Sequence, residues 1–412
     1  MTDLDVSGAA TGTGDRSRPR GVLPALCATQ ITGWGIVYYA FPVLLPRVTE
    51  DTGWSPGAAT AAFSAALLVS AVAGIPVGRV LDRQGPRTVM TTGSVLAVLA
   101  LLAVATAPNL HVFTAGWLLA GLAMAATFYQ PAFAALTRWW GTRRVRALTV
   151  VTLAGGLAST VFAPLTAALA EHLTWRATYL VLAGILAAVT IPAHALALRA
   201  PWPPAPKAPA RRPDQAPSVT RSRPFLFLAG AFTLSGFAMH GVVFGLVPLL
   251  TERGADPTTA AWVLGLGGAG QTLGRVLYAP LAHRSGVTTR TAVFIAAGAA
   301  TTLALALVSG PVPLLILLSV LAGVVRGNLT LLQATSVADR WGTAAYGRLS
   351  GLLAAPATVA GALAPWAGVA LAGPMGGYSG LFLGLATASV MATVLVLSAG
   401  HLTPGPDNAR RG

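Results

Sequence analysis

The chain consists of long apolar stretches separated by short polar loops. A membrane-spanning helix needs about 20 mostly apolar residues. Twelve stretches of the sequence meet this requirement: 22–46, 56–78, 88–107, 110–137, 146–170, 176–198, 224–250, 258–281, 289–309, 312–337, 346–372 and 378–400. The pattern predicts an all-α membrane protein with twelve transmembrane helices in two pseudo-symmetric bundles of six.

The composition agrees with a protein that lies in a lipid bilayer. Only 9% of the 412 residues are charged and 54% are hydrophobic, whereas a soluble domain carries about 25% charged residues. The single cysteine, Cys27, excludes an intrachain disulfide. The net charge of +15 does not indicate nucleic-acid binding, because the basic residues lie in short loops on one side of the apolar stretches.

The distribution of arginine predicts the orientation of the chain. Most arginines fall in loops on one side, while the opposite side keeps only Arg47, Arg176 and Arg253. Because cytoplasmic loops are enriched in basic residues, we expect both termini in the cytoplasm of a cell-membrane protein. The polar start of the chain does not resemble a signal peptide.

Five segments follow from this organisation. A cytoplasmic tail (1–21) precedes a six-helix bundle (22–198), a Pro- and Arg-rich cytoplasmic linker (199–223), a second bundle (224–400) and a short cytoplasmic tail (401–412). The halves repeat each other: Gly121 runs on to Arg138-Trp-Trp-Gly-Thr, and Gly323 runs on to Asp339-Arg-Trp-Gly-Thr. A repeat of two six-helix halves is typical of transporters whose site lies at the midplane between them.

A short motif follows the second apolar stretch. It reads Gly78-Arg-Val-Leu-Asp82-Arg83-Gln-Gly85-Pro-Arg87, in which the glycines allow a tight turn and close helix approach. With twelve helices and a central linker, the chain resembles the major facilitator superfamily over essentially its whole length. The resemblance implies a gating motif in which Asp82 pairs with basic groups and stabilises one gate state. The alternative is that these arginines only enforce topology.

Within that superfamily, the eighth stretch resembles the monocarboxylate porters and the oxalate–formate exchanger. The resemblance implies that Arg275 contacts a substrate carboxylate. Many of these porters carry an aspartate four residues earlier, where this chain has Gln271. Proton-coupled drug antiporters instead carry an arginine where Trp117 stands, and the fifth stretch lacks their glycine–proline motif. These departures argue against a drug antiporter.

Two arginines, Arg275 and Arg326, lie deep inside apolar stretches, and no acidic residue lies in any of them. An intramembrane arginine is costly and faces a polar cavity or a partner. A guanidinium suits bidentate binding of a carboxylate, so the expected partner is an anionic substrate. The alternative is an arginine satisfied by backbone carbonyls at a helix break.

Other intramembrane polar residues complete the predicted site. His240 is a candidate proton carrier, since histidine titrates near neutral pH, or else a hydrogen-bonded structural residue. Tyr278 and Asn328 are candidate partners of the arginines. The remaining candidates for the cavity wall are Gln30, Tyr38, Tyr129 and Gln130.

The sequence contains no phosphate-binding loop, metal-ligand cluster or nucleophile motif. It therefore predicts no enzyme, no cofactor and no metal, but a monomeric carrier of a small organic anion, a mono- or dicarboxylate. Coupling to a proton or a counter-anion stays open. The alternatives are an exporter of a toxic or secreted metabolite and a non-transporting membrane sensor.

Overall fold

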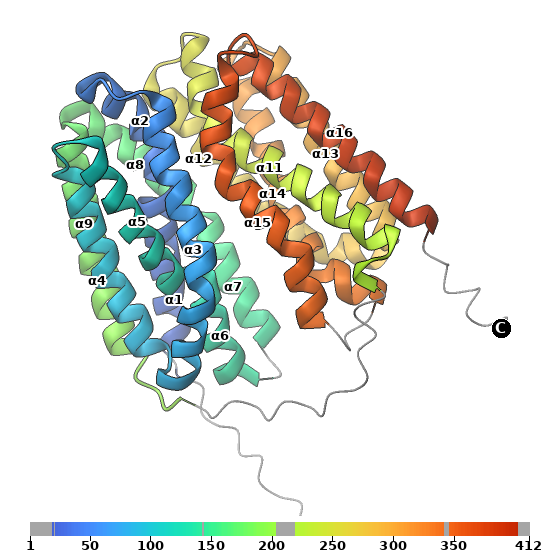
Figure 1. Ribbon diagram of the computed structural model, residues 1–412, viewed down its shortest axis with the longest axis horizontal. Coiled ribbons are helices and arrows are strands. Elements are labelled where there is room, and N and C mark those ends of the chain that lie inside the picture. Colours follow the sequence, from blue (N-terminus) through green and yellow to red (C-terminus); the bar gives the residue numbers. More distant parts are fainter. Residues whose placement is uncertain (1–18, 20, 142–143, 203–218, 342–345, 403–412) are drawn as a thin grey trace, which may run out of the picture.

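The chain forms two bundles, each of six membrane helices (Figure 1). The computed structural model describes residues 19, 21–141, 144–202, 219–341 and 346–402. The first bundle consists of α1 (Val22–Gly33), the π-helix η1 (Trp34–Tyr39) and α2 (Ala40–Thr52) as one unit, α3 (Pro56–Gln84), α4 (Pro86–Ala105), α5 (Leu110–Thr127) with α6 (Tyr129–Trp140), α7 (Arg144–Gly156) with α8 (Ala158–His172), and α9 (Trp175–Pro192) with the π-helix η3 (Ala193–Ala197). The second consists of α11 (Arg223–Glu252), α12 (Pro257–Arg284), α13 (Val287–Leu307), α14 (Val312–Trp341), α15 (Tyr346–Ala372) and α16 (Tyr378–Leu402).

The predicted all-α fold class is confirmed. Ten spans among the described helices are long and apolar enough to cross a membrane. The two units outside this set are the first, which η1 interrupts, and α12, which carries Arg275. The tails and most of the linker expected at 199–223 lie outside the described residues.

One expectation is wrong in its local geometry. The segment from Gly78 to Arg87 is not a loop, because α3 continues through Gly78 and Asp82 to Gln84. Only Gly85 turns the chain, with φ +81°, a conformation that favours glycine. Pro86 then starts α4, where a residue without an N–H costs nothing.

Helices of the first bundle are interrupted at positions where the sequence showed only continuous apolar stretches. Pro131 lacks the N–H that would bond to the Thr127 carbonyl, and the chain is extended at Phe128 between α5 and α6. The free Thr127 carbonyl instead accepts a hydrogen bond from Gln30 Nε2 at 2.7 Å. A proline also follows the π-helix η1, namely Pro42 in α2. Short π-helical segments frequently mark functional sites.

The repeat seen in the sequence reappears as equivalent helix contacts. α3 packs on α5 and α4 on α9 in the first bundle, while α12 packs on α14 and α13 on α16 in the second. Gly121 lies against the Ala66 carbonyl of α3, and Gly323 lies against the Gly267 carbonyl of α12. A Cβ at either position would clash with backbone, so these glycines allow the helix pairs their close approach.

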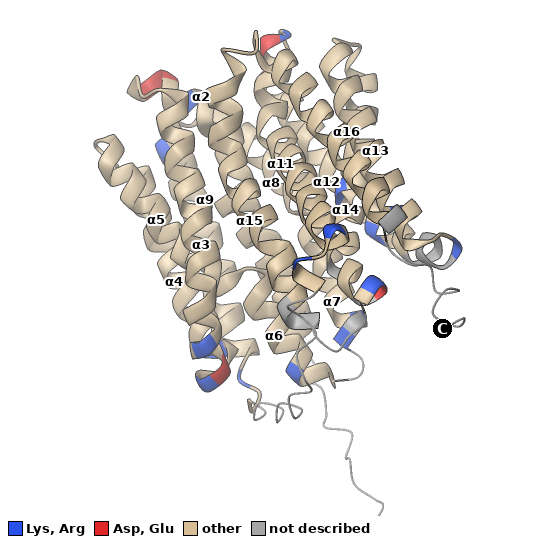
Figure 2. Cartoon of the chain, turned by 45° about the vertical axis from the view of Figure 1, so that its right-hand side comes forward, with Lys and Arg blue, Asp and Glu red and all other residues tan. Residues whose placement is uncertain are grey.

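The two bundles meet mainly through α8 on α12 and α3 on α15. Near the end where the acidic residues Glu171 and Glu252 lie, the Thr258 hydroxyl donates to the Glu171 carboxylate. Further along the same helix pair, Thr160 Oγ1 donates to the Gly265 carbonyl at 2.8 Å. In Figure 1 the bundles converge at this end and diverge towards the end where Figure 2 places most arginines.

Each bundle has one arginine that stabilises it at the end where the two bundles converge. Arg253 Nη1 donates to the carbonyls of Leu305 (2.8 Å) and Val308 (2.6 Å) at the C-terminus of α13. Its Nη2 donates to Ala306 O and to Ser379 Oγ. In the first bundle, Arg176 Nη1 donates to Ala105 O and Ala107 O at the C-terminus of α4. These cations satisfy carbonyls that a helix end leaves unpaired and favourably face its negative dipole end.

We expect Arg253→Ala to destabilise the protein by about 2–4 kcal/mol, because several carbonyls lose a charged donor and become unpaired. The measurement is thermal unfolding of the purified protein in detergent. Arg47→Ala is the matched control, since the Arg47 side chain is exposed at the same end. An equal melting temperature for both variants would contradict the capping role of Arg253.

Candidate functional site

A cavity of about 360 Å³ lies between the two bundles. The first bundle contributes residues of η1, α3, α5 and α6, and the second contributes residues of α11, α14 and α15. The lining comprises Trp34, Tyr38, Leu67, Ser70, Ala71, Met124, Ala125, Phe128, Tyr129, Gln130, Gly236, Met239, His240, Gln333, Ala357, Thr358, Gly361 and Ala362. The size falls within the range of about 300–1,000 Å³ typical of small-molecule sites.

The wall contributed by the first bundle is aromatic. Trp34 stacks on Phe128 with ring centroids 4.1 Å apart and lies 5.2 Å from the rings of Tyr38 and Tyr129. These residues come from the two interrupted helices, namely η1 and the break at Phe128. The helix breaks therefore bring the aromatic rings together on one side of the cavity.

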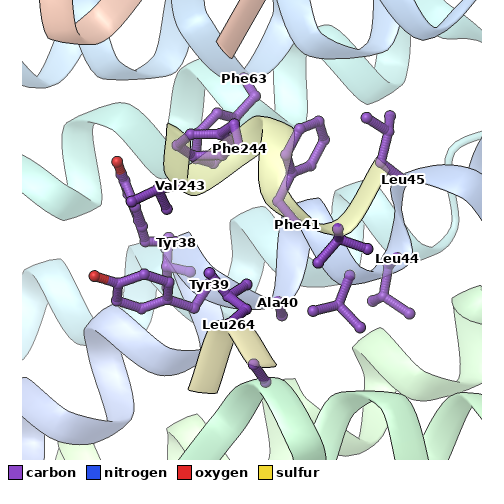
Figure 3. Packing of buried hydrophobic residues seen from close by; sticks show 14 of the residues in the cluster. Tyr38, Tyr39, Ala40, Phe41, Leu44, Leu45, Phe63, Val243, Phe244 and Leu264 are labelled. Atoms are coloured by element: carbon purple, nitrogen blue, oxygen red, sulfur yellow. The ribbon is translucent and has the colours of Figure 1, made fainter. Parts of the chain in front are cut away.

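Aromatic packing also closes the cavity towards the end where the bundles converge. Phe244 of α11 lies 5.2 Å from both Tyr38 and Phe63 of the first bundle. Figure 3 shows these rings together, with the hydroxyl groups of Tyr38 and Tyr39 pointing to the same side. Phe63 stacks on Phe41 and contacts Trp117, which is fully buried in the bundle core.

Arg275 lies beside this cavity, at the contact between the bundles. Its side chain is 8% exposed, and its Nη1 donates to the Thr152 carbonyl in the C-terminal turn of α7. Thr272, on the same face of α12, donates to the neighbouring Leu153 carbonyl at 3.2 Å. Tyr129, which lines the cavity, lies close by, because its hydroxyl is placed against Gly155 while the guanidinium is placed against Gly156. In this conformation Arg275 is thus satisfied by the opposite bundle, at the helix break before α8.

The glycine pair Gly155–Gly156 makes this arrangement possible. The Tyr129 hydroxyl lies over Gly155, where an added Cβ would clash with it. Over Gly156, a Cβ would lie 3.2 Å from Arg275 Nη1 and 2.6 Å from Thr272 Oγ1. Because neither glycine has a side chain, the Tyr129 hydroxyl and the Arg275 guanidinium have room to lie against this part of the helix.

Arg326 occupies a different position, on the inner side of the second bundle. Its Nε donates to Gln271 Oε1 at 3.2 Å, so the predicted neighbours Arg326 and Gln271 are brought together. Its Nη2 is buried and has no hydrogen-bond partner among the described residues. Arg326 lines a smaller cavity of about 50 Å³, which shares Met239 with the central one.

His240 lines the central cavity with a defined tautomer. Its Nδ1 lies 2.8 Å from the Gly236 carbonyl, which only accepts hydrogen bonds, so Nδ1 carries a proton. Nε2 is therefore the atom that gains or loses a proton. Gly361 of α15 makes room for the ring, because a Cβ there would lie 3.0 Å from it.

The other predicted residues divide into two groups. Tyr38, Tyr129 and Gln130 line the cavity. Gln30, Tyr278 and Asn328 are not among its lining residues: Gln30 bonds to Thr127, Tyr278 to Thr335 at 2.9 Å, and Asn328 to Val324 at 2.8 Å.

The motif residues lie away from the cavity, at the arginine-rich end. Asp82 forms an ion pair with Arg138, which stacks on Trp202 at 4.4 Å and thereby joins the motif to the start of the linker. Arg87 Nε donates to the Ala195 carbonyl at 3.0 Å, and Arg83 is exposed. These contacts lie within the first bundle, except that of Arg138 with Trp202, which reaches the start of the linker.

Several cavity residues were not predicted from the sequence, namely Trp34, Phe128, Met239, Gln333 and Thr358. Two of them carried a signal: Trp34 lies between glycines, and Phe128 stands three residues before a proline inside an apolar stretch. In the described part of the chain, no group of three or more His, Cys, Asp or Glu residues is placed to hold a metal ion.

We expect Gly156→Val to displace Arg275 and Thr272, at an overpacking cost of about 1–3 kcal/mol. Thermal unfolding and ligand binding of the purified variant would measure this effect. Gly184→Val is the matched control, because an added Cβ in α9 meets no atom within 4 Å. If Gly156→Val behaves like this control, the glycine pair does not position the guanidinium.

Comparisons with known proteins agree with this architecture. The model of the Major Facilitator Superfamily matches residues 26–252 and 226–412. Monocarboxylate transporter 13 of Bos taurus is 33% identical over 206 residues, which cover 49% of this chain and 47% of the relative. Monocarboxylate transporter 11 of Homo sapiens is 32% identical over 255 residues, 60% of this chain and 52% of the relative. The chain spans about half the length of these curated relatives, which are transporters and not enzymes.

Solved structures share the fold at low sequence identity. A bacterial homologue of the human lysosomal transporter Spinster, in an inward-facing and occupied conformation, has a TM-score of 0.73 and 13% identity, and the match covers 94% of this chain and 98% of that one. The nucleoside transporter NupG, as a mutant, has a TM-score of 0.75 and 15% identity over 92% of this chain and 99% of its own. The family model, the relatives and the two six-helix bundles together identify the chain as a multi-pass membrane protein of the major facilitator superfamily, with relatives in the monocarboxylate porter branch.

Proposed function

We propose that this protein carries a small organic anion, a carboxylate, through the cell membrane by alternating access. The observation that carries the proposal is Arg275, a buried cation beside the cavity that no carboxylate of the described chain neutralises. The names of the relatives, monocarboxylate transporters 11 and 13, support the same substrate class. Arg326, with an unpaired and buried Nη2, is a second cation near the cavity.

The contacts of Arg275 suggest how binding and movement are connected. Its guanidinium joins α12 of one bundle to the Thr152 carbonyl of the other, next to the Tyr129 hydroxyl over the adjacent glycine. A carboxylate arriving at Tyr129 competes for the same donors and forms stronger, charge-assisted bonds than a carbonyl does. Binding therefore replaces a contact between the bundles with a contact to the substrate, which frees the bundles to rock.

The orientation expected from the loop arginines assigns the two ends of this conformation to the two sides of the membrane. With the arginine-rich end (Figure 2) in the cytoplasm, the bundles converge on the outside and diverge towards the inside (Figure 1). The ion pair of Asp82 with Arg138 then belongs to the inner gate. Within the described residues the pair lies inside the first bundle, which suits a motif that holds that bundle's end together while the gate is open.

His240 is the proposed proton site of the cycle. Among the cavity-lining residues, it is the one whose ordinary pKa of about 6.5 permits a change of charge near neutral pH. Arg326 lines the adjoining cavity, which shares Met239 with the central one, so its positive field reaches the neighbourhood of the imidazole. An anion in the cavity offsets that field, so anion and proton bind better together than separately.

We expect Arg275→Ala to weaken carboxylate binding by about 10- to 150-fold, the loss of one charge-assisted hydrogen bond of about 1.5–3 kcal/mol. Counterflow in proteoliposomes, measured with labelled acetate and phenylacetate, is the test. Arg284→Ala is the control on the same helix, since its side chain is exposed. Unchanged counterflow in a folded Arg275→Ala protein would exclude an anion site at this arginine.

We expect His240→Gln to retain anion exchange but to lose stimulation by an acidic exterior, because glutamine holds no extra proton. The measurement is uptake at several external pH values with fixed internal pH, corrected with protein-free liposomes. Acid stimulation that persists in His240→Gln would assign the proton to another group or to the substrate itself.

A further inference from the structure

The two walls of the central cavity differ in shape and chemistry. One wall carries the rings of Trp34, Tyr38, Phe128 and Tyr129. The opposite wall, from α11, α14 and α15, carries small or flexible side chains (Met239, Ala357, Thr358, Gly361 and Ala362) together with two polar ones, His240 and Gln333. The central cavity, called the slot below, therefore has aromatic rings on the side of the first bundle and mainly small or aliphatic groups on the side of the second.

The aromatic faces are accessible to a ligand. Trp34, Phe128 and Tyr129 are each partly exposed, in contrast to the fully buried rings of the bundle core such as Trp117 and Phe113. Trp34 and Phe128 are stacked at 4.1 Å with an angle of 26° between their planes, and Tyr129 lies 5.2 Å from Trp34. A preformed stack of this kind accepts a further planar ring by offset stacking or edge contact.

The charge of the slot restricts the ligand further. Its described lining holds no Asp, Glu, Lys or Arg, and Arg275 is the cation that lies next to the lining residue Tyr129, where the two side chains are placed against Gly156 and Gly155. A single carboxylate next to Tyr129 would be neutralised there. A second carboxylate on the body of the ligand would face only the His240 imidazole, which is uncharged unless it takes up a further proton, and burying an unpaired charge there is costly.

We propose that the preferred substrate is a monocarboxylate whose body is a flat aromatic ring, bound with its carboxylate at Tyr129 and Arg275 and its ring between the aromatic wall and Met239. This inference rests on the proposed function and narrows its substrate class. A small aliphatic acid leaves most of the 360 Å³ slot unfilled and gains nothing from the stack. The Trp34 ring is then a specificity-determining group, while Arg275 supplies the charge.

The test compares four probes of related shape by equilibrium binding to the purified full chain: phenylacetate, acetate, the neutral phenylacetamide and the dianionic phenylmalonate. Phenylacetate should bind at least about tenfold more tightly than acetate, because its ring is removed from water in the slot. Phenylacetate should also bind more tightly than the neutral phenylacetamide and the dianionic phenylmalonate. This comparison uses the wild-type protein and needs no variant to fold.

Two variants locate the ring. Trp34→Ala should remove most of the preference for phenylacetate over acetate, whereas Trp262→Ala, at a tryptophan 49% exposed on α12, should leave it unchanged. Thr358→Phe fills the slot from the opposite wall and should exclude phenylacetate while acetate still binds. The two changes act from different helices, so a folding defect in one does not remove the test.

The outcomes separate the two proposals. Equal affinity for phenylacetate and acetate, or tighter binding of phenylmalonate, overturns the aromatic inference and leaves the carboxylate carrier in place. Tighter binding of phenylacetamide, with no response to Arg275→Ala, overturns both. A preference for phenylacetate that Trp34→Ala does not change places the ring elsewhere and also overturns the inference.

Discussion

This structure depends on one kind of interaction, the hydrogen bond from an arginine side chain to the carbonyl groups near the C-terminus of a helix. Lipid offers no hydrogen bonds to a free carbonyl and no water to a buried cation, so each group needs the other. Arg176 holds the end of α4, Arg253 the end of α13, and Arg275 the C-terminal turn of α7. The first two contacts lie within a bundle, while the third crosses between bundles. The same chemistry therefore stabilises a single bundle in two places and joins the two bundles in the third.

Glycine sets where helices approach and where polar groups fit. Gly121 and Gly323 bring equivalent helix pairs into backbone contact in the two bundles. Gly155 and Gly156 instead leave space for the Tyr129 hydroxyl and the Arg275 guanidinium. Glycines thus fulfil two roles, tight packing inside a bundle and room for polar groups between bundles.

The cavity separates recognition of shape from recognition of charge. Broken helices in the first bundle present aromatic rings, and the second bundle supplies the nearby cation Arg275, the imidazole of His240 and small or aliphatic side chains. Under the proposed function, a ligand binds tightly only when both bundles contact it. This division makes binding sensitive to the relative position of the bundles, which is the property that alternating access requires.

The sequence by itself determined the membrane-spanning character, the all-α fold and the repeat, because apolar stretches of membrane length admit few other structures. It also singled out Arg275, Arg326 and Gln271, since charged and polar groups in such stretches are rare. Only the tertiary structure decided that Arg275 bonds to the opposite bundle, that Gln30 serves a helix break, and that Asp82 stands on a helix facing Arg138. The aromatic wall is likewise a product of tertiary structure, because Trp34 and Phe128 are 94 positions apart in the chain and meet only when two interrupted helices pack together.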